Sequence, residues 1–174
     1  MNIYIALLRG INVGGHKKIL MADLRELLEN AGLNEVRTYI QSGNVIFHSE
    51  ALAKECEQLI TDAILNKYGW EVPVIITKPS EIKAILDKCP FSEEKKIKSY
   101  FTILSERPSE ERIKEVQKLS DPVEEFFITK TCIYFWYENY ARSKFSNNFF
   151  ERKLKVKATA RNYRTMMKLI DISL

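Results

Sequence analysis

The stretch VRTYIQSGNVIF, Val36 to Phe47, predicts two short strands joined by a turn. Its central Gln-Ser-Gly-Asn is rich in residues typical of tight turns, and apolar or β-branched residues flank it on both sides. Apolar residues at helical spacing precede this hairpin over Leu20–Ala31 and follow it from Ser49 to Tyr68. A hairpin between two helices therefore predicts one unit of alternating strands and helices.

Two further apolar runs complete that unit. Ile3–Leu8 precedes the first helix, and Val72–Thr77 follows the second, after Gly69. The resulting order is strand, helix, strand, strand, helix, strand. This is the split βαβ arrangement of ferredoxin-like folds, so we predict that arrangement for the first half of the chain.

The second half of the chain repeats this order up to its last element. The expected elements are strands at Ser99–Leu104, Glu125–Thr129 and Cys132–Tyr137, and helices at Ser109–Leu119 and Arg142–Leu154. A helix from about Ala160 to Ile170 takes the place of the closing strand. The fold class predicted is α+β, with duplicated ferredoxin-like halves, mainly antiparallel sheets and a C-terminal helix. The predicted domains are 1–78 (first half), 79–98 (connecting helix and linker), 99–157 (second half) and 158–174 (C-terminal helix).

Composition excludes several classes of protein. The chain is 45% hydrophobic and 29% charged, and its apolar runs are far shorter than the ~20 residues of a membrane span. No secretory signal is visible. Three cysteines without a CxxC pair indicate reduced thiols in the cytoplasm, and His16 and His48 are too isolated to suggest a zinc site. We therefore expect a cytoplasmic protein with no metal, no cofactor and no membrane association.

Charge is distributed unevenly along the chain. From Arg142 to Lys168 nine basic residues stand against one acid, Glu151, and the first 22 residues contain no acid. Such separation favours an anionic partner, whether a small molecule or nucleic acid. The alternative is a lysine-rich face that is simply solvated.

The glycine-rich stretch LLRGINVGGHKK, Leu7 to Lys18, matches no established phosphate motif. Gly10 and Gly15 have the spacing of GxxxxGK[ST], but His16 and Lys17 stand where that motif needs Lys and a hydroxyl. Glycines still allow backbone amides to approach a ligand, and the basic residues can neutralise an anion. The alternative is a strand-to-helix turn whose lysines face water.

Topology brings this stretch toward the hairpin turn. In a split βαβ unit the first two strands run parallel, so the loops after them lie at the same edge of the sheet. A third stretch, TARNYR, has Thr159 as a predicted helix N-cap and Arg161 in a first turn, where a bound anion would offset repulsion from the helix dipole. We expect all three stretches to form one basic pocket. The predicted ligand-binding residues are Arg9, Asn12, Gly14, Gly15, Lys17, Gln41, Ser42, Asn44, Thr159, Arg161 and Asn162.

Three blocks of sequence resemble a known family. They are ALLRGINVGGHKKILMADLRELLENAG, VRTYIQSGNVIF and TARNYRTMMKL, and they are similar to the signature blocks of a bacterial family catalogued as domain of unknown function 1697. The resemblance implies a duplicated, ferredoxin-like α+β architecture and no established activity. Its motif positions include Gly10 and Gly43, and Tyr163 departs from the tryptophan expected in many relatives.

Three functions are compatible with these patterns. The first is binding of a phosphate-bearing ligand, a nucleotide or nucleic acid, with base stacking on Tyr100, Phe101, Tyr134 and Trp136 as one version. The second is a small metal-independent enzyme with no assigned reaction, in which Lys17 or His16 transfers protons and Arg9 and Arg161 stabilise negative charge. The third is a structural or interaction protein whose polar loops join the two halves, with Asn12, Asn44 and Asn162 satisfying backbone groups.

Overall fold

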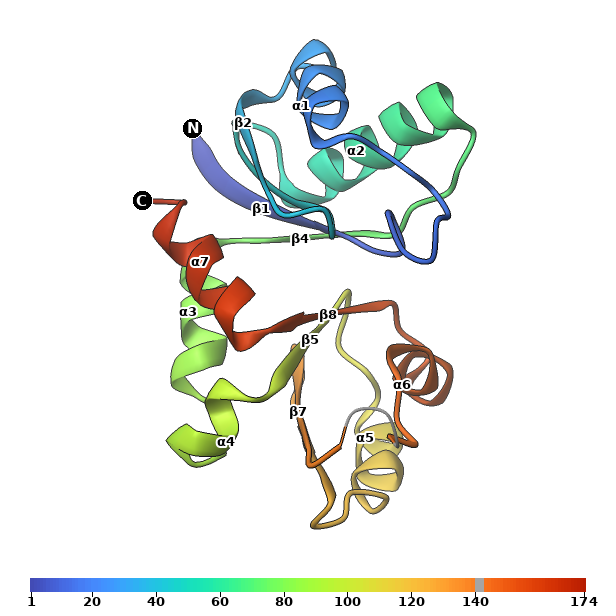
Figure 1. The fold of residues 1–174 in the computed structure, drawn as a ribbon, viewed down its shortest axis with the longest axis vertical. Helices are drawn as coiled ribbons and strands as arrows, with labels where there is room; N and C mark the ends of the chain where they lie inside the picture. The colour runs from blue at the N-terminus through green and yellow to red at the C-terminus, as the bar shows by residue number, and fades with distance from the viewer. Residues whose placement is uncertain (140–142) are drawn as a thin grey trace. The chain divides into compact units, whose positions relative to one another are not determined.

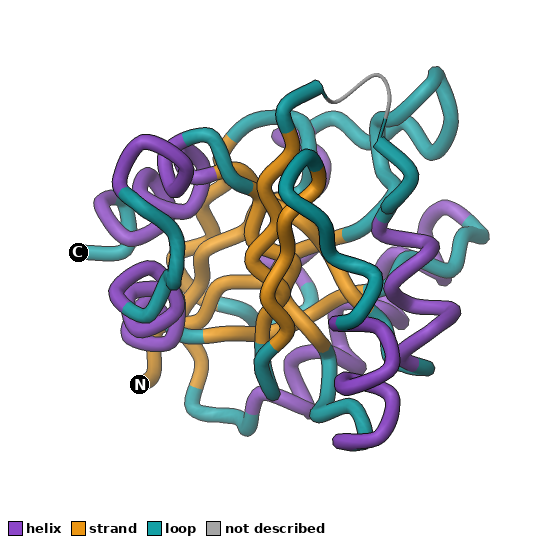
Figure 2. The backbone as a smooth tube through the Cα atoms, turned by 90° about the horizontal axis from the view of Figure 1, so that it is seen from below, coloured by secondary structure: helices purple, strands orange, loops and turns teal. Residues whose placement is uncertain are grey.

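The computed structural model describes residues 1–139 and 143–174. The chain divides into two compact units, which we call unit 1 (Met1–Lys83 with Leu169–Leu174) and unit 2 (Ala84–Lys168). Each unit contains one four-stranded sheet with helices (Figure 1; strands are orange in Figure 2). The protein is therefore α+β, as predicted.

Unit 1 has the element order expected from the sequence. Its elements are β1 (Asn2–Leu8), α1 (Met21–Asn30), β2 (Asn34–Tyr39), β3 (Asn44–Ser49), α2 (Ala53–Tyr68) and β4 (Val74–Thr77). The strand order in the sheet is β2-β3-β1-β4, and all neighbours are antiparallel. Since β1 and β2 both run opposite to β3, they run parallel to each other, and the loops that follow them leave the same edge.

The core of unit 1 lies between the sheet and its two helices. Figure 1 shows α1 and α2 on the same side of this sheet. Alternating residues of β1, such as Tyr4 and Ala6, pack with Phe47 of β3 and with the apolar faces of both helices. Ile11 and Ile19, from the loop between β1 and α1, are buried in the same core. That loop is therefore fastened to the core at both of its ends.

Unit 2 repeats this topology. Its strands are β5 (Tyr100–Leu104), β6 (Glu124–Ile128), β7 (Cys132–Tyr137) and β8 (Ala158–Asn162), and its helices α4 (Glu93–Ile97), α5 (Glu110–Gln117) and α6 (Asn147–Leu154). Helices α3 (Pro79–Asp87) and α7 (Tyr163–Asp171) contain the boundaries between the units. The sheet order β6-β7-β5-β8 is that of unit 1 in the equivalent positions, which confirms the predicted duplication. Assignment to the ferredoxin-like fold family stays a prediction.

The closing strand of unit 2 corrects the sequence analysis. Residues 158–162 form β8, which pairs antiparallel with β5 and places Arg161 opposite Phe101. Thr159 is therefore a strand residue and not a helix N-cap. Asn162 takes that role, because its Oδ1 accepts a hydrogen bond of 2.9 Å from the Thr165 N–H. ATARN carries little strand propensity, but the open edge of β5 supplies the hydrogen bonds that make it a strand.

A second correction concerns the helix predicted over Arg142–Leu154. Helix α6 begins at Asn147, where the Ser146 hydroxyl accepts a hydrogen bond from the Phe149 N–H at 3.2 Å. The predicted start, Arg142, lies outside the described residues. Ser146 is a far better N-cap than Lys144 or Phe145 before it, so local capping sets this boundary.

Candidate functional site

The glycine-rich loop between β1 and α1 contains a small hairpin. Val13 and His16 pair across a two-residue turn, and the His16 N–H donates to the Val13 carbonyl at 3.0 Å. Gly14 and Gly15, with φ of 58° and 78°, supply the left-handed backbone that such a turn requires. The glycines therefore form a turn that protrudes into solvent, and they do not wrap a phosphate in the manner of a P-loop.

Asn12 closes the loop behind this hairpin. Its Nδ2 donates to the Ile19 carbonyl at 3.0 Å and to the Gln41 carbonyl at 2.8 Å, and its Oδ1 accepts from the Ile19 N–H at 2.8 Å. Asn12 also has a φ of 55°, which asparagine tolerates better than most residues. All the hydrogen-bonding groups of this amide serve the backbone, so Asn12 holds the loop in shape.

The loops after β1 and β2 meet, as predicted. Besides the bond from Asn12 to Gln41, the Leu8 N–H donates to the Gly43 carbonyl at 2.8 Å. A Cβ on Gly43 would lie 2.7 Å from the Leu8 Cβ, so the two segments touch closely. We call residues 9–20 and 40–43 together the loop edge of unit 1.

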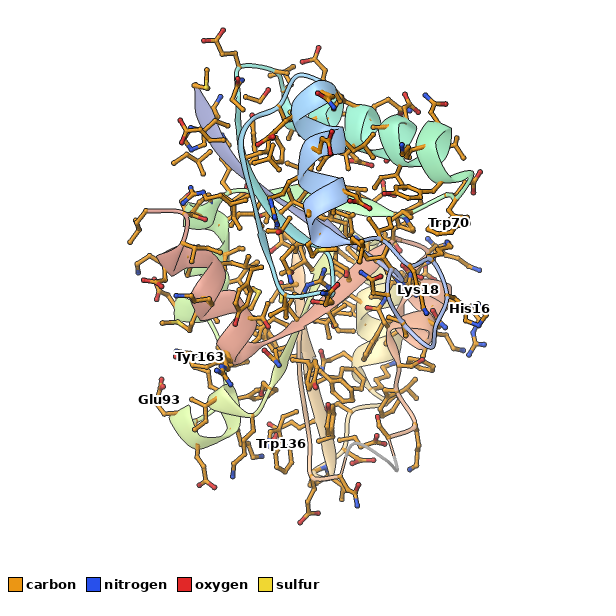
Figure 3. The ribbon with its side chains drawn as sticks, turned by 45° about the horizontal axis from the view of Figure 1, so that its top comes forward. His16, Lys18, Trp70, Glu93, Trp136 and Tyr163 are labelled. Carbon is orange, nitrogen blue, oxygen red and sulfur yellow. The ribbon has the colours of Figure 1, made fainter. Side chains whose placement is uncertain are left out.

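A third segment lies on the opposite side of residues 9–20. Lys17 donates from Nζ to the Glu71 carbonyl at 2.7 Å, and the Arg9 N–H donates to the Pro73 carbonyl at 3.0 Å. The basic loop is therefore tied to the chain between α2 and β4. Figure 3 shows His16 and Lys18 of the loop toward the same end of unit 1 as Trp70 of that segment.

The polar groups of the loop edge fall into two sets. Asn44 is fully buried and donates to the Tyr39 carbonyl and to the Ser42 hydroxyl, each at 3.0 Å, so it stabilises the turn. Gln41 and Ser42 are exposed. Lys18 is exposed too, and within the described chain neither its side chain nor the Gly14 and Gly15 amides have a partner. Lys18 and the amides of Gly14 and Gly15 are therefore available to a ligand.

The predicted residues of unit 2 lie on or beside β8. Arg161 is 8% exposed, and its Nη1 donates to the Thr159 hydroxyl at 2.8 Å and to the Ala160 carbonyl at 2.9 Å. Burial lowers the pKa of Arg161 to about 10, so the side chain stays charged at neutral pH. That these residues join the loop edge in one pocket stays a prediction.

The sheet of unit 2 does not present the aromatic platform considered from the sequence. Phe101 and Tyr134 are buried, and the Tyr134 hydroxyl donates to the Ile85 carbonyl at 2.9 Å. Tyr100 stacks on Tyr137. The Trp136 ring has Lys95 Nζ at 4.3 Å from its centroid. Base stacking on Phe101 and Tyr134 is therefore not supported.

Two cysteine thiols and the His16 imidazole lie in surroundings that do not activate them, as far as the described residues show. Burial is the main cause that raises the pKa of both the Cys89 and Cys132 thiols, which disfavours the reactive thiolate. The His16 side chain is exposed, and no acid among the described residues orients it. No cluster of three His, Cys, Asp or Glu that could hold a metal ion occurs in the described part of the chain.

A pocket in unit 2 has the wrong charge for phosphate. It is lined by Asp121, Val123, Glu124, Glu138, Asn139 and Lys144. Three carboxylates against one lysine repel an anion. This pocket is accordingly not the candidate site.

Two residues of the site were missing from the sequence-based list. Lys18 is not among the predicted ligand-binding residues, although it is the lysine of the loop without a partner among the described residues. No sequence motif includes Trp70. Its segment lies at the loop because the Glu71 and Pro73 carbonyls accept hydrogen bonds from Lys17 and Arg9. The acid-free N-terminal stretch was the signal that pointed to Lys18.

The fold and the loop edge define a two-unit α+β protein with a basic, glycine-containing loop. The chain belongs to the family described as protein of unknown function (DUF1697), whose model matches residues 1–134. A similar solved structure is that of the conserved bacterial protein SP0830 from Streptococcus pneumoniae, with a TM-score of 0.76 and 23% sequence identity, covering 99% of this chain and 98% of that chain. No curated protein matches the chain.

These findings confirm the family and the fold. Within the described residues no helix has the length and apolar character to cross a membrane. A cytoplasmic location stays a prediction from the cysteine pattern.

Proposed function

We propose that the chain binds a phosphate-bearing ligand, a nucleotide or nucleic acid, at the loop edge of unit 1. The observation that supports this proposal is a basic loop whose backbone is held by hydrogen bonds, while several of its hydrogen-bond donors are exposed to solvent. Lys18 and the Gly14 and Gly15 amides have no partner in the described chain, while Asn12 and Lys17 hold the backbone around them. A preformed set of donors binds an anion at low entropic cost.

The residues of the loop edge have different roles in this proposal. Lys18 neutralises phosphate charge, and Lys17 adds its own charge while one of its three N–H donors stays on the Glu71 carbonyl. Arg9 lies at the start of the loop. Gly14 and Gly15 offer backbone amides, and the exposed Gln41 and Ser42 offer neutral donors from the second loop. Asn12 and Asn44 do not contact the ligand, because their amides already bind backbone and turn groups.

The residues of β8 are a second candidate contact for an anion. Arg161 retains a charged, buried guanidinium beside the Thr159 hydroxyl. Asn162 is occupied as the N-cap of α7 and is left out of the proposed contacts.

Inorganic tripolyphosphate tests the proposal without assuming a base or sugar. Calorimetric titration of the wild-type protein should give saturable binding that weakens as salt is added, since cations of the protein replace counterions. The double variant Lys17→Ala/Lys18→Ala should bind about ten-fold more weakly, in line with the loss of charge-assisted hydrogen bonds.

A matched control comes from the other unit. Lys130 is exposed in the β6–β7 turn, which is the unit 2 equivalent of residues 40–43. Lys130→Ala removes one charge and should leave the affinity unchanged. Equal weakening by the control and the double variant, or no binding by the wild-type protein, would overturn the proposal.

A further inference from the structure

Two aromatic side chains stack at the end of α2. The rings of Tyr68 and Trp70 have centroids 5.2 Å apart and planes inclined by 13°. Between them Gly69 ends the helix with a φ of 74°, which turns the chain so that both rings lie together. Both side chains pack against the core of unit 1 and remain partly exposed. The pair thus presents aromatic surface on a rigid base.

This aromatic pair adjoins the proposed phosphate site. Glu71, the residue after Trp70, receives the hydrogen bond from Lys17 Nζ at 2.7 Å. Pro73 receives the bond from the Arg9 N–H at 3.0 Å. Figure 3 shows Trp70 toward the same end of unit 1 as Lys18. These bonds, which span more than fifty residues of sequence, therefore bring the segment that carries Trp70 beside the basic loop.

Acids near the pair limit what charge alone can contribute. Asp23 lies close enough to Tyr68 to add to the effect of burial, and together they raise the pKa of the Tyr68 hydroxyl. Glu71 is exposed beside Lys17. Because one acid lies near Tyr68 and the other beside Lys17, the attraction of this region for bare phosphate is reduced. An uncharged contribution such as stacking would add affinity that these acids do not oppose.

The second tryptophan of the chain provides an internal contrast. Trp136 in unit 2 already has Lys95 over its ring, and Lys95 also pairs with Glu125. In the described residues no cation lies over Trp70, and its stacking partner is the neutral Tyr68. Trp70 is thus the tryptophan whose ring has no cation over it among the described residues, and a ligand ring would stack on the face that Tyr68 does not cover.

We propose that Trp70 stacks on a nucleobase whose phosphates are held by Lys17 and Lys18, so that the ligand is a nucleotide, free or within single-stranded nucleic acid. This inference rests on the proposed function and specifies its ligand. Base–aromatic stacking tolerates any base, so no sequence preference is expected from this contact.

Fluorescence of Trp70 tests the inference directly. The chain has two tryptophans, so Trp136→Phe leaves Trp70 as the sole indole emitter. Four probes are titrated into this variant: ATP, inorganic tripolyphosphate, a single-stranded oligoadenylate of twelve nucleotides, and an abasic strand of the same length. We expect saturable quenching by ATP or oligoadenylate. Tripolyphosphate and the abasic strand should compete for the site without quenching.

Substitution of Trp70 provides the second readout. Trp70→Leu should weaken binding of the base-bearing probe about ten-fold and leave tripolyphosphate affinity unchanged. Trp70 packs against the core, so each variant is checked by thermal melting. If Trp70→Leu does not fold, Trp70→Phe replaces it with a smaller expected loss. The quenching experiment uses the intact ring and decides the question in either case.

The outcomes separate the two proposals. Binding of tripolyphosphate with no gain from a base, and no quenching of Trp70, would overturn this inference and leave the phosphate site standing. Absence of binding by all four probes would overturn both. Tighter binding of oligoadenylate with a steep salt dependence would identify a nucleic acid, and tighter binding of ATP would identify a mononucleotide.

Discussion

The two units build the same strand order with very different first connections. In unit 1 twelve residues (9–20) link β1 to α1, whereas in unit 2 five residues (105–109) link β5 to α5. Both connections lead from the equivalent strand of the sheet, in sheets of identical order, to the helix that follows it. The short version shows that this topology does not require a long, glycine-rich loop.

The longer connection is also the better braced of the two. Asn12, Lys17 and Arg9 attach it to neighbouring segments, and Ile11 and Ile19 bury their side chains in the core of unit 1. A loop that is longer than its topology needs, and is held in one shape, is typical of a binding element on a scaffold. This difference between the units therefore supports a functional role for residues 9–20.

The helices that follow the two connections start differently. Ser109 caps α5 by accepting a hydrogen bond from the Arg112 N–H at 3.4 Å. Leu20 occupies the N-cap position of α1 and provides no side-chain cap. Unit 2 thus uses its connection to stabilise the helix, and unit 1 does not.

The largest effect is expected where the two loops of unit 1 touch. Gly43→Ala places a Cβ 2.7 Å from the Leu8 Cβ and imposes a left-handed conformation on alanine. Overpacking and backbone strain together should lower the free energy of unfolding by about 3–4 kcal/mol, measured by urea denaturation.

Gly10→Ala is the matched control for this substitution. Gly10 has a similar φ of 74°, but a Cβ there meets no atom within 4 Å. Gly10→Ala should lower the free energy of unfolding only by the strain of a left-handed backbone at alanine, about 1 kcal/mol. Equal losses for both variants would show that the close approach of the loops does not matter.

Asn12→Ala should have the next largest effect. It removes three hydrogen bonds to the backbone and puts alanine at a φ of 55°. We expect a loss of about 2–3 kcal/mol in the free energy of unfolding, together with faster amide exchange at Ile19. Glu106→Ala, an exposed change in the short connection of unit 2, should stay within about 0.5 kcal/mol. A loss for Asn12→Ala no larger than that of the control would contradict the bracing role.

The helix caps offer a reciprocal test with a smaller effect. Ser109→Ala should destabilise the protein by about 1 kcal/mol, because the Arg112 N–H loses its partner. Leu20→Ser should stabilise it by up to about 1 kcal/mol, since Leu20 is exposed and contributes little to the core. Thermal melting measures both. If Leu20→Ser does not raise the melting temperature and Ser109→Ala does not lower it, the two connections do not differ in how they cap their helices.

The smallest effect concerns the connection between α5 and β6. The Asp121 carboxylate accepts hydrogen bonds from the Val123 and Glu124 N–H groups, each at 2.8 Å, and these lower its pKa. A carboxyl group with a lowered pKa in the folded state adds stability above the unfolded pKa of about 3.9, and that stability is lost as pH falls through the folded value.

Comparison of Asp121→Asn with the wild-type protein tests this carboxylate. The wild type should be slightly more stable at pH 6, and the difference should shrink below pH 4. In unit 1 the equivalent connection uses Gly32, with a φ of 103°, and has no such carboxylate. A difference in stability that does not change with pH would show that the Asp121 charge plays no part.

Much of the fold could be predicted because its signals are local. The helical spacing of apolar residues predicted α1, and the Gln-Ser-Gly-Asn turn predicted the hairpin of β2 and β3. The same reasoning failed at β8, because the strand state of residues 158–162 depends on pairing with β5, more than fifty residues earlier. Thr159 looked like an N-cap since its hydroxyl suits that role, but Asn162 lies where the helix begins.

The site was predicted less completely than the fold. Right-handed topology placed the loops after β1 and β2 together, and the contact of Asn12 with Gln41 confirms it. Side-chain chemistry alone could not tell which polar residues bind the backbone. Asn12 and Asn44 therefore entered the list of ligand contacts, although their amides are used within the protein.

By itself, the sequence determined the order of elements in unit 1, the duplication and the excess of positive charge near the N-terminus, because periodicity, turn residues and charge are properties of neighbouring positions. Only the tertiary structure decided that β8 is a strand, that Arg161 is buried, and that Trp70 lies by the basic loop. Each of these depends on a partner far away in the chain, and hydrogen bonds and burial form only when that partner is in place.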